Sequence, residues 1–107
     1  MRIYDLSTLN RFCETQKSKP HYAALKSQVK QWYHEASQAK WASTAEIKAR
    51  YATASIITAE RVVFNLVSNH YRLIVKIDFD WSIIFVCFIG THKEYDKVDA
   101  RSVEYGD

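Results

Sequence analysis

The chain has 107 residues, a formal net charge of +3, and 48% hydrophobic and 25% charged residues. This length predicts a single domain over residues 1–107. No apolar run is long enough to span a membrane, and no leader pattern begins the chain, so we expect a cytoplasmic protein without membrane contact. Cys13 and Cys87 lie in apolar patterns without a second ligand at metal spacing. They predict reduced core thiols rather than a disulfide or a metal site.

The charge is unevenly distributed along the chain. Residues 1–50 contain nine Lys or Arg and four Asp or Glu (+5), whereas residues 51–107 contain six and eight (−2). A basic first half predicts a polyanionic partner at one surface, and the acidic second half is compatible with a basic partner at another. An ordinary solvated surface accounts for the charge alone equally well.

The first half of the chain predicts helices after a short edge strand at residues 2–4. Asp5 or Ser7 can cap a first helix that ends near Lys17–Lys19. Pro20 suits the first turn of a second helix. The apolar residues of that helix keep a helical spacing over more than four turns: Tyr22, Leu25, Val29, Trp32, Tyr33 and Ala36.

A short third helix is predicted after Trp41. Ser43 and Glu46 have the Ser-x-x-Glu spacing in which each side chain binds the other's exposed amide, and the helix should end near Tyr51. Trp41 and Trp81 can stack on RNA or contact a partner protein, but we expect both to be buried.

The second half predicts an antiparallel meander. Residues 61–66 and 71–78 alternate between apolar and polar, and they can pair through a turn at residues 67–70, with Asn69 at positive φ. The third run, residues 82–89, is apolar on both sides and therefore central. The hairpin has one apolar face and one basic face, and the basic face carries Arg61, Asn65, Arg72 and Lys76.

Helices followed by a meander predict an α+β fold with the N-terminal helices packed on one face of a small antiparallel sheet. The basic face then remains free, unless the terminal segment or a partner covers the second apolar side of the third strand. Residues after Ala100 are short and polar, and we expect them to be frayed.

The third strand ends in Gly90 and is followed at once by a cluster of ionisable groups. The most specific stretch is Gly90, Thr91, His92, Lys93, Glu94, Tyr95 and Asp96. With the preceding positions from about Trp32 onward, this stretch resembles the HigB toxin family, relatives of RelE with a compact sheet carrying helices on one side. The further positions that carry the resemblance are Lys40, Trp41, Ile47, Lys48, Tyr51, residues 61–65, residues 71–73, Phe88 and Ile89.

The resemblance implies an mRNA interferase, a ribosome-dependent messenger-RNA endonuclease that inhibits translation by cleaving mRNA without a metal ion or other cofactor. Its partners would be the ribosome, the mRNA and a HigA-like antitoxin. Such antitoxins usually carry a helix-turn-helix domain, so DNA binding is expected only through the antitoxin. The turn at residues 67–70 departs from the glycine-rich turn that is common in the family.

Metal-free RNA cleavage needs a base for the ribose 2′-hydroxyl, cations for the developing phosphorane charge and an acid for the leaving 5′-oxygen. We predict His92 as acid or base, assisted by Tyr95 or Glu94, with Arg72 and Lys76 holding the phosphate. Residues expected to contact RNA are Arg61, Lys93, Lys48 and Arg50. Each of these groups also has an ordinary structural explanation, as a strand-end hydrogen bond or a solvated charge.

The main alternative is a noncatalytic module that binds RNA or an acidic protein with the basic sheet face. Gly90 and Gly106 are the only glycines. A dinucleotide fingerprint, a P-loop and a nucleophile elbow all need more glycines at fixed spacing, so these enzyme classes are excluded.

Overall fold

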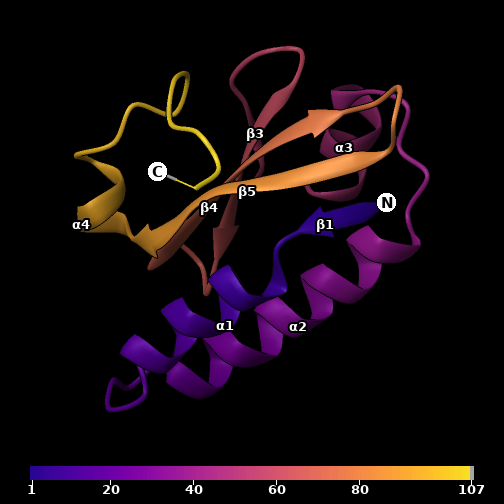
Figure 1. Cartoon of the computed structure of the whole chain (residues 1–107). Helices are drawn as coiled ribbons and strands as arrows, with labels where there is room; N and C mark the ends of the chain where they lie inside the picture. Colours follow the sequence, from indigo (N-terminus) through magenta and orange to yellow (C-terminus); the bar gives the residue numbers. More distant parts are fainter. Residues whose placement is uncertain (107) are drawn as a thin grey trace.

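The computed structural model describes residues 1–106. Its elements are β1 (Arg2–Tyr4), α1 (Leu6–Thr15), α2 (Tyr22–Gln38), α3 (Thr44–Arg50), β2 (Ser55–Ile56), β3 (Arg61–Leu66), β4 (Tyr71–Asp78), β5 (Ile83–Thr91) and α4 (His92–Tyr95). The sheet order is β1-β5-β4-β3-β2, with only β1 parallel to its neighbour. The helices α1 and α2 run side by side along one side of this sheet (Figure 1). The predicted α+β class is therefore confirmed.

The local signals in the sequence explain most of the helices. The Asp5 carboxylate caps α1 by accepting from the Thr8 amide at 2.7 Å. The predicted stripe of α2 supplies its buried residues, namely Leu25, Val29, Trp32 and Ala36. The predicted capping box of α3 is wrong in detail, because the Ser43 side chain makes no cap bond and the Glu46 carboxylate accepts from the Ala42 amide instead.

The β3–β4 hairpin forms as predicted, but its turn differs. Leu66 pairs with Tyr71, and positive φ occurs at Val67 and Ser68, not at Asn69. Left-handed backbone is unfavourable for a β-branched residue, so neighbouring contacts must hold it. One such contact is the Gln28 side-chain oxygen on α2, which accepts from the Val67 amide at 2.7 Å. The turn is thus tied to the helical layer.

The sheet has a hydrophobic core on each face. The larger core lies between the sheet and α1, α2 and α3, and includes Leu9, Trp32, Ile47, Leu73 and Ile84, all at most 3% exposed. The smaller core lies on the opposite face, where residues of the C-terminal segment pack over the sheet (Figure 1). Its members are Val63, Ile74 and Cys87, with Ile57, Phe85, Phe88, Tyr95, Val98, Ala100 and Val103 packed against them. The sheet is therefore covered in part on both sides.

This second core corrects the expectation of a frayed C-terminus, and it confirms the alternative that the terminal segment covers the second apolar side of the third strand. The C-terminal segment, residues 98–105, is not frayed. The Tyr105 ring packs near Phe85, and its hydroxyl donates to the Asp5 carboxylate. The basic sheet face is consequently not free along its whole length.

We also expected Trp81 to be buried, but its side chain at the β4–β5 turn is 76% exposed.

Both cysteines are buried free thiols, as the apolar patterns predicted. Burial raises the pKa of each thiol, because a thiolate is poorly solvated in an apolar environment. No helix within residues 1–106 is long and apolar enough to cross a membrane.

Candidate functional site

The end of β5 turns sharply into α4, and this junction positions several predicted site residues. The Thr91 hydroxyl accepts from the Glu94 amide at 3.1 Å, and the Glu94 carboxylate accepts from the Thr91 amide at 2.8 Å. This reciprocal pair is a capping box. Its Thr-x-x-Glu spacing is visible in the sequence, but we did not predict it. One oxygen of Glu94 therefore serves the helix start.

Gly90 is required just before this junction by close approach. A Cβ at position 90 would lie 2.4 Å from the Phe88 ring and 3.2 Å from the Glu94 side-chain oxygen. Because real Cβ atoms do not approach other atoms so closely, any side chain here would displace the Phe88 ring. Glycine thus allows α4 to fold back against the sheet.

Arg72 and Tyr95 meet on the uncovered part of the second sheet face. The guanidinium carbon of Arg72 lies 5.5 Å from the centroid of the Tyr95 ring, within cation–π range. Its Nη1 also donates to the Asn69 carbonyl at 2.9 Å. The ring and the turn together orient a cation that has no carboxylate partner among its described contacts. Such a cation is suited to binding an anion.

His92 lies at the first position of α4, and its side chain is 52% exposed. Its Nε2 is 3.5 Å from a carboxylate oxygen of Asp96, one helical turn further on. The backbone amide of His92 donates to the His70 carbonyl at 2.9 Å, which ties α4 to the β3–β4 turn. The imidazole is therefore oriented by Asp96 yet open to solvent, as a group that exchanges protons with a substrate must be.

An open pocket of about 420 Å³ adjoins His92. Its lining comes from three segments: His21 before α2, residues 69–71 at the β3–β4 turn and the start of β4, and Thr91 and Lys93 beside His92. Sequence reasoning did not select His21, Asn69 or His70. No local sequence pattern indicates a functional role for them, because His21 is far from His92 in the chain and because Asn69 and His70 are residue types that are ordinary in a turn.

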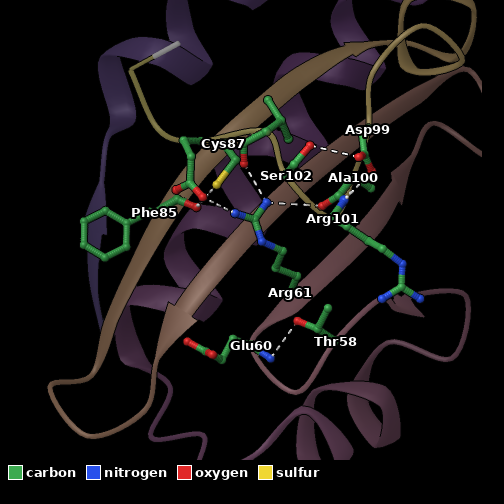
Figure 2. Close-up of polar contacts among 11 residues, drawn as sticks. Thr58, Glu60, Arg61, Phe85, Cys87, Asp99, Ala100, Arg101 and Ser102 are labelled. Atoms are coloured by element: carbon green, nitrogen blue, oxygen red, sulfur yellow. Dashed lines mark hydrogen bonds and ion pairs between the residues drawn. The ribbon is translucent and has the colours of Figure 1, made fainter.

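Arg61 lies on the same sheet face but is covered by the C-terminal segment. Its Nη1 donates to the carbonyls of Ala100 (3.2 Å) and Val103 (2.5 Å), and its Nη2 lies 2.6 Å from the Glu104 carboxylate. Figure 2 shows the Arg61 guanidinium beneath the C-terminal segment, with a dashed line to the Ala100 carbonyl. The side chain is 5% exposed. In this conformation Arg61 does not present its charge to RNA, contrary to our expectation.

The other predicted cations lie apart from His92. Lys76 pairs in register with Arg61 and Phe85, four residues from Arg72 and so roughly 13 Å along the strand. The Lys48 ammonium donates to the carbonyls of Ala52 and Ala54, after the end of α3. The structure thus brings Arg72 to Tyr95 and places His92 and Lys93 together at the pocket, with Glu94 between them in α4. It does not bring Lys76, Arg61, Lys48 or Arg50 to either group.

Arg50 forms an ion pair with Glu35 and lies over the Tyr51 ring, on the side of the molecule where α2 and α3 meet. The Glu35 carboxylate also accepts from the Tyr51 hydroxyl, and these hydrogen bonds lower its pKa. Within residues 1–106, no group of three or more His, Cys, Asp or Glu side chains is arranged to hold a metal ion.

The chain also matches a known protein family. The HigB_toxin family, described as the RelE-like toxic component of a toxin-antitoxin system, matches residues 25–98, more than half of the chain. The chain belongs to the HigB toxin family. As the toxin of such a system, it has an antitoxin as its partner. Among curated proteins, none matches the chain.

The family match for this HigB toxin covers the cluster at the end of β5. Arg72, His92 and Tyr95 all lie within residues 25–98. His21 and the C-terminal residues that enclose Arg61 lie outside them. The cluster therefore lies within the family pattern, whereas the C-terminal residues that cover Arg61 lie beyond it.

Proposed function

We propose that this HigB toxin is a ribosome-dependent mRNA endonuclease that cleaves RNA without a metal ion and so inhibits translation. The observation that carries the proposal is the contact of Arg72 with Tyr95 on the sheet face, with the exposed His92 three residues before Tyr95 in α4, in a chain of the HigB toxin family. One group offers a fixed positive charge, and the other two are able to transfer protons.

The reaction is attack of a ribose 2′-oxygen on the adjacent phosphorus, with cleavage of the bond to the 5′-oxygen. A base removes the proton of the 2′-hydroxyl, and an acid donates a proton to the leaving 5′-oxygen. The products are a 2′,3′-cyclic phosphate and a free 5′-hydroxyl. No redox step or further reactant is needed.

In this proposal His92 is one of the two proton-transfer groups, and the Asp96 carboxylate, 3.5 Å from its Nε2, orients the ring. Arg72 binds the phosphate oxygens, on which negative charge grows in the transition state. Tyr95 orients the guanidinium and is the second candidate for proton transfer. Glu94 holds the start of α4 through its capping bond and so positions His92.

The remaining cations have supporting roles in the same proposal. Lys93 lines the pocket beside His92, where it can contact the RNA backbone. Lys76 is too far along the strand to share a phosphate with Arg72, so we assign it to the RNA backbone away from the cleavage position. Lys48 and Arg50 lie on another side and are candidates for ribosomal RNA contacts. The antitoxin is proposed to be HigA-like.

The test compares induced wild-type chain with His92→Ala at equal protein levels, by growth and by mapping new mRNA ends. His34→Ala, which changes an exposed histidine on α2, is the matched control. We expect wild type and control to arrest growth and cut mRNA, and His92→Ala to cut about 100- to 10,000-fold more slowly. Purified mRNA with and without ribosomes tests the ribosome dependence.

A folded wild-type chain that neither arrests growth nor cuts mRNA would contradict the proposal. The noncatalytic binding module would then account for the exposed cations on the sheet face. In that case His92→Ala and Tyr95→Phe should change binding little, whereas Arg72→Ala should weaken it.

A further inference from the structure

The pocket beside His92 has an aromatic wall that the proposed cleavage chemistry does not use. The imidazole rings of His21 and His70 are stacked, with centroids 4.0 Å apart and planes inclined by 26°. The two rings come from the loop before α2 and from the β3–β4 turn. Both line the open pocket. A stacked pair at the edge of a cavity offers a flat face on which a further ring can lie.

Lys93 gives the pocket a fixed positive charge, which favours an anionic ligand. The described lining contains three histidines, Tyr71 and Lys93, with Asn69 and Thr91 as neutral polar groups and no carboxylate. The nearest described acidic groups are engaged elsewhere, Asp96 with the His92 imidazole and Glu94 with the Thr91 amide. A ligand with a flat ring and a negative charge fits this combination, and a nucleotide has both.

The β3–β4 turn connects this pocket to the cleavage cluster. Its Asn69 carbonyl accepts from Arg72, and its His70 carbonyl accepts from the His92 amide, each at 2.9 Å. Gln28 holds the start of the turn through the Val67 amide. The pocket therefore adjoins His92 directly and is linked to Arg72 through the backbone of the turn.

We propose that this pocket is a nucleotide subsite, which binds one base of the mRNA next to the cleaved phosphate. The base stacks on the His21–His70 pair, and Lys93 contacts the adjoining phosphate. His21 and His70 act as specificity-determining residues, and by fixing one nucleotide they place the RNA backbone beside His92. This inference rests on the proposed endonuclease function and adds the groups that select the substrate.

The experiment measures kcat and KM for mRNA cleavage on purified ribosomes and maps the cut positions. The variants are His70→Ala, His21→Ala and His70→Phe, with His34→Ala as the matched control for loss of an exposed histidine. We expect each alanine change in the pocket to lower kcat/KM by about 10-fold or more, chiefly through KM, and to relax the base preference beside the cut. His70→Phe, which keeps the aromatic face, should restore most of the loss.

Circular dichroism and the urea midpoint check that each variant is folded. Since His21 and His70 come from different segments, misfolding of one variant leaves the other informative. The subsite is wrong, and the endonuclease function stands, if wild type cuts mRNA while both alanine variants cut the same positions with unchanged kcat/KM. It is also wrong if they weaken only antitoxin binding. A wild-type chain that cuts nothing overturns both proposals.

Discussion

Arg61 and Arg72 lie on the same face of neighbouring strands, and the sequence gives them the same pattern. In the structure they differ completely. Arg61 is 4% exposed and donates to two carbonyls and the Glu104 carboxylate. Arg72 is only partly buried, lies over the Tyr95 ring and has one strong backbone acceptor. One arginine is used to hold the C-terminal segment, and the other remains able to bind a ligand.

What separates the two arginines is the path of the C-terminal segment. Residues 98–105 pass over the part of the face that carries Arg61, where Val63 and Cys87 form an apolar surface. Near Arg72 the face is left to α4, which contributes Tyr95 and the adjoining His92. Strand alternation assigns a side chain to a face, but the segment that packs over that face determines whether the side chain is available.

The largest expected effect is on catalysis at Arg72. Arg72→Ala should lower mRNA cleavage by about 100- to 1000-fold, because the transition-state charge loses a positioned cation. Arg72→Lys should cleave mRNA at a rate between those of wild type and Arg72→Ala, since lysine keeps the charge but not the planar donors. The measurement is kcat/KM on ribosomes, with Arg11→Ala on the exposed side of α1 as control. Unchanged cleavage by a folded Arg72→Ala chain would remove Arg72 from the phosphate site.

At Arg61 the expected effect is on stability. Arg61→Ala should lower the free energy of unfolding by about 3 kcal/mol, because it leaves two carbonyls without their donor and removes a buried side chain. Urea unfolding measures the change. Arg101→Ala, an exposed arginine of the same segment, should stay within about 0.5 kcal/mol of wild type. If cleavage per folded molecule fell as much as in Arg72→Ala, the distinction between the two arginines would be lost.

The two arginines also show which structural features the sequence patterns could predict and which they could not. The bounds of β3 and β4 followed from alternation, and α2 followed from its apolar stripe, since both patterns depend on neighbours in the chain. The covering of Arg61 did not follow. Residues after Ala100 are polar, and their path depends on contacts with residues about forty positions earlier.

The residues of the candidate site also divide into those that the sequence predicted and those that it did not. His92, Glu94, Tyr95 and Lys93 adjoin one another in the chain, so their proximity was expected. Arg72 lies near this stretch because it pairs with Gly90 across β4 and β5. His21 was missed, since its approach to His70 depends on how α2 packs against the sheet. Local patterns therefore find groups on one or two strands, but not the groups that tertiary packing adds.

A smaller effect is expected at the start of α4. Thr91→Val keeps the shape of the side chain but removes the oxygen that accepts from the Glu94 amide. Loss of such a cap should cost about 1 kcal/mol of stability. Because the box also orients His92 and Tyr95, cleavage should fall with it, whereas Thr91→Ser, which keeps the hydroxyl, should retain both. Equal cleavage by the valine and serine variants would mean that α4 is positioned by other contacts.

Arg50 provides an intermediate case between Arg61 and Arg72, and it predicts the smallest effect. It is 54% exposed and pairs with Glu35, whose pKa is lowered chiefly by the Tyr51 hydroxyl and also by Arg50. A carboxyl with a lowered folded-state pKa stabilises the fold above its ordinary value of about 4.3, and that stabilisation is lost as the pH falls through the folded-state pKa. Because both side chains are partly exposed, solvent screening keeps this stabilisation of the fold small.

Glu35→Gln should therefore lower stability at pH 7 and flatten its decline below about pH 5. The measurement is urea unfolding of wild type and variant at pH 7 and pH 4, with Glu14→Gln, an exposed carboxyl on α1, as control. A variant that follows the wild-type pH dependence would show that the Glu35 pair is not maintained in solution. Arg50 would then lack a carboxylate partner, as Arg72 does among the described residues, and its expected contact with ribosomal RNA would need no competing ion pair to be broken.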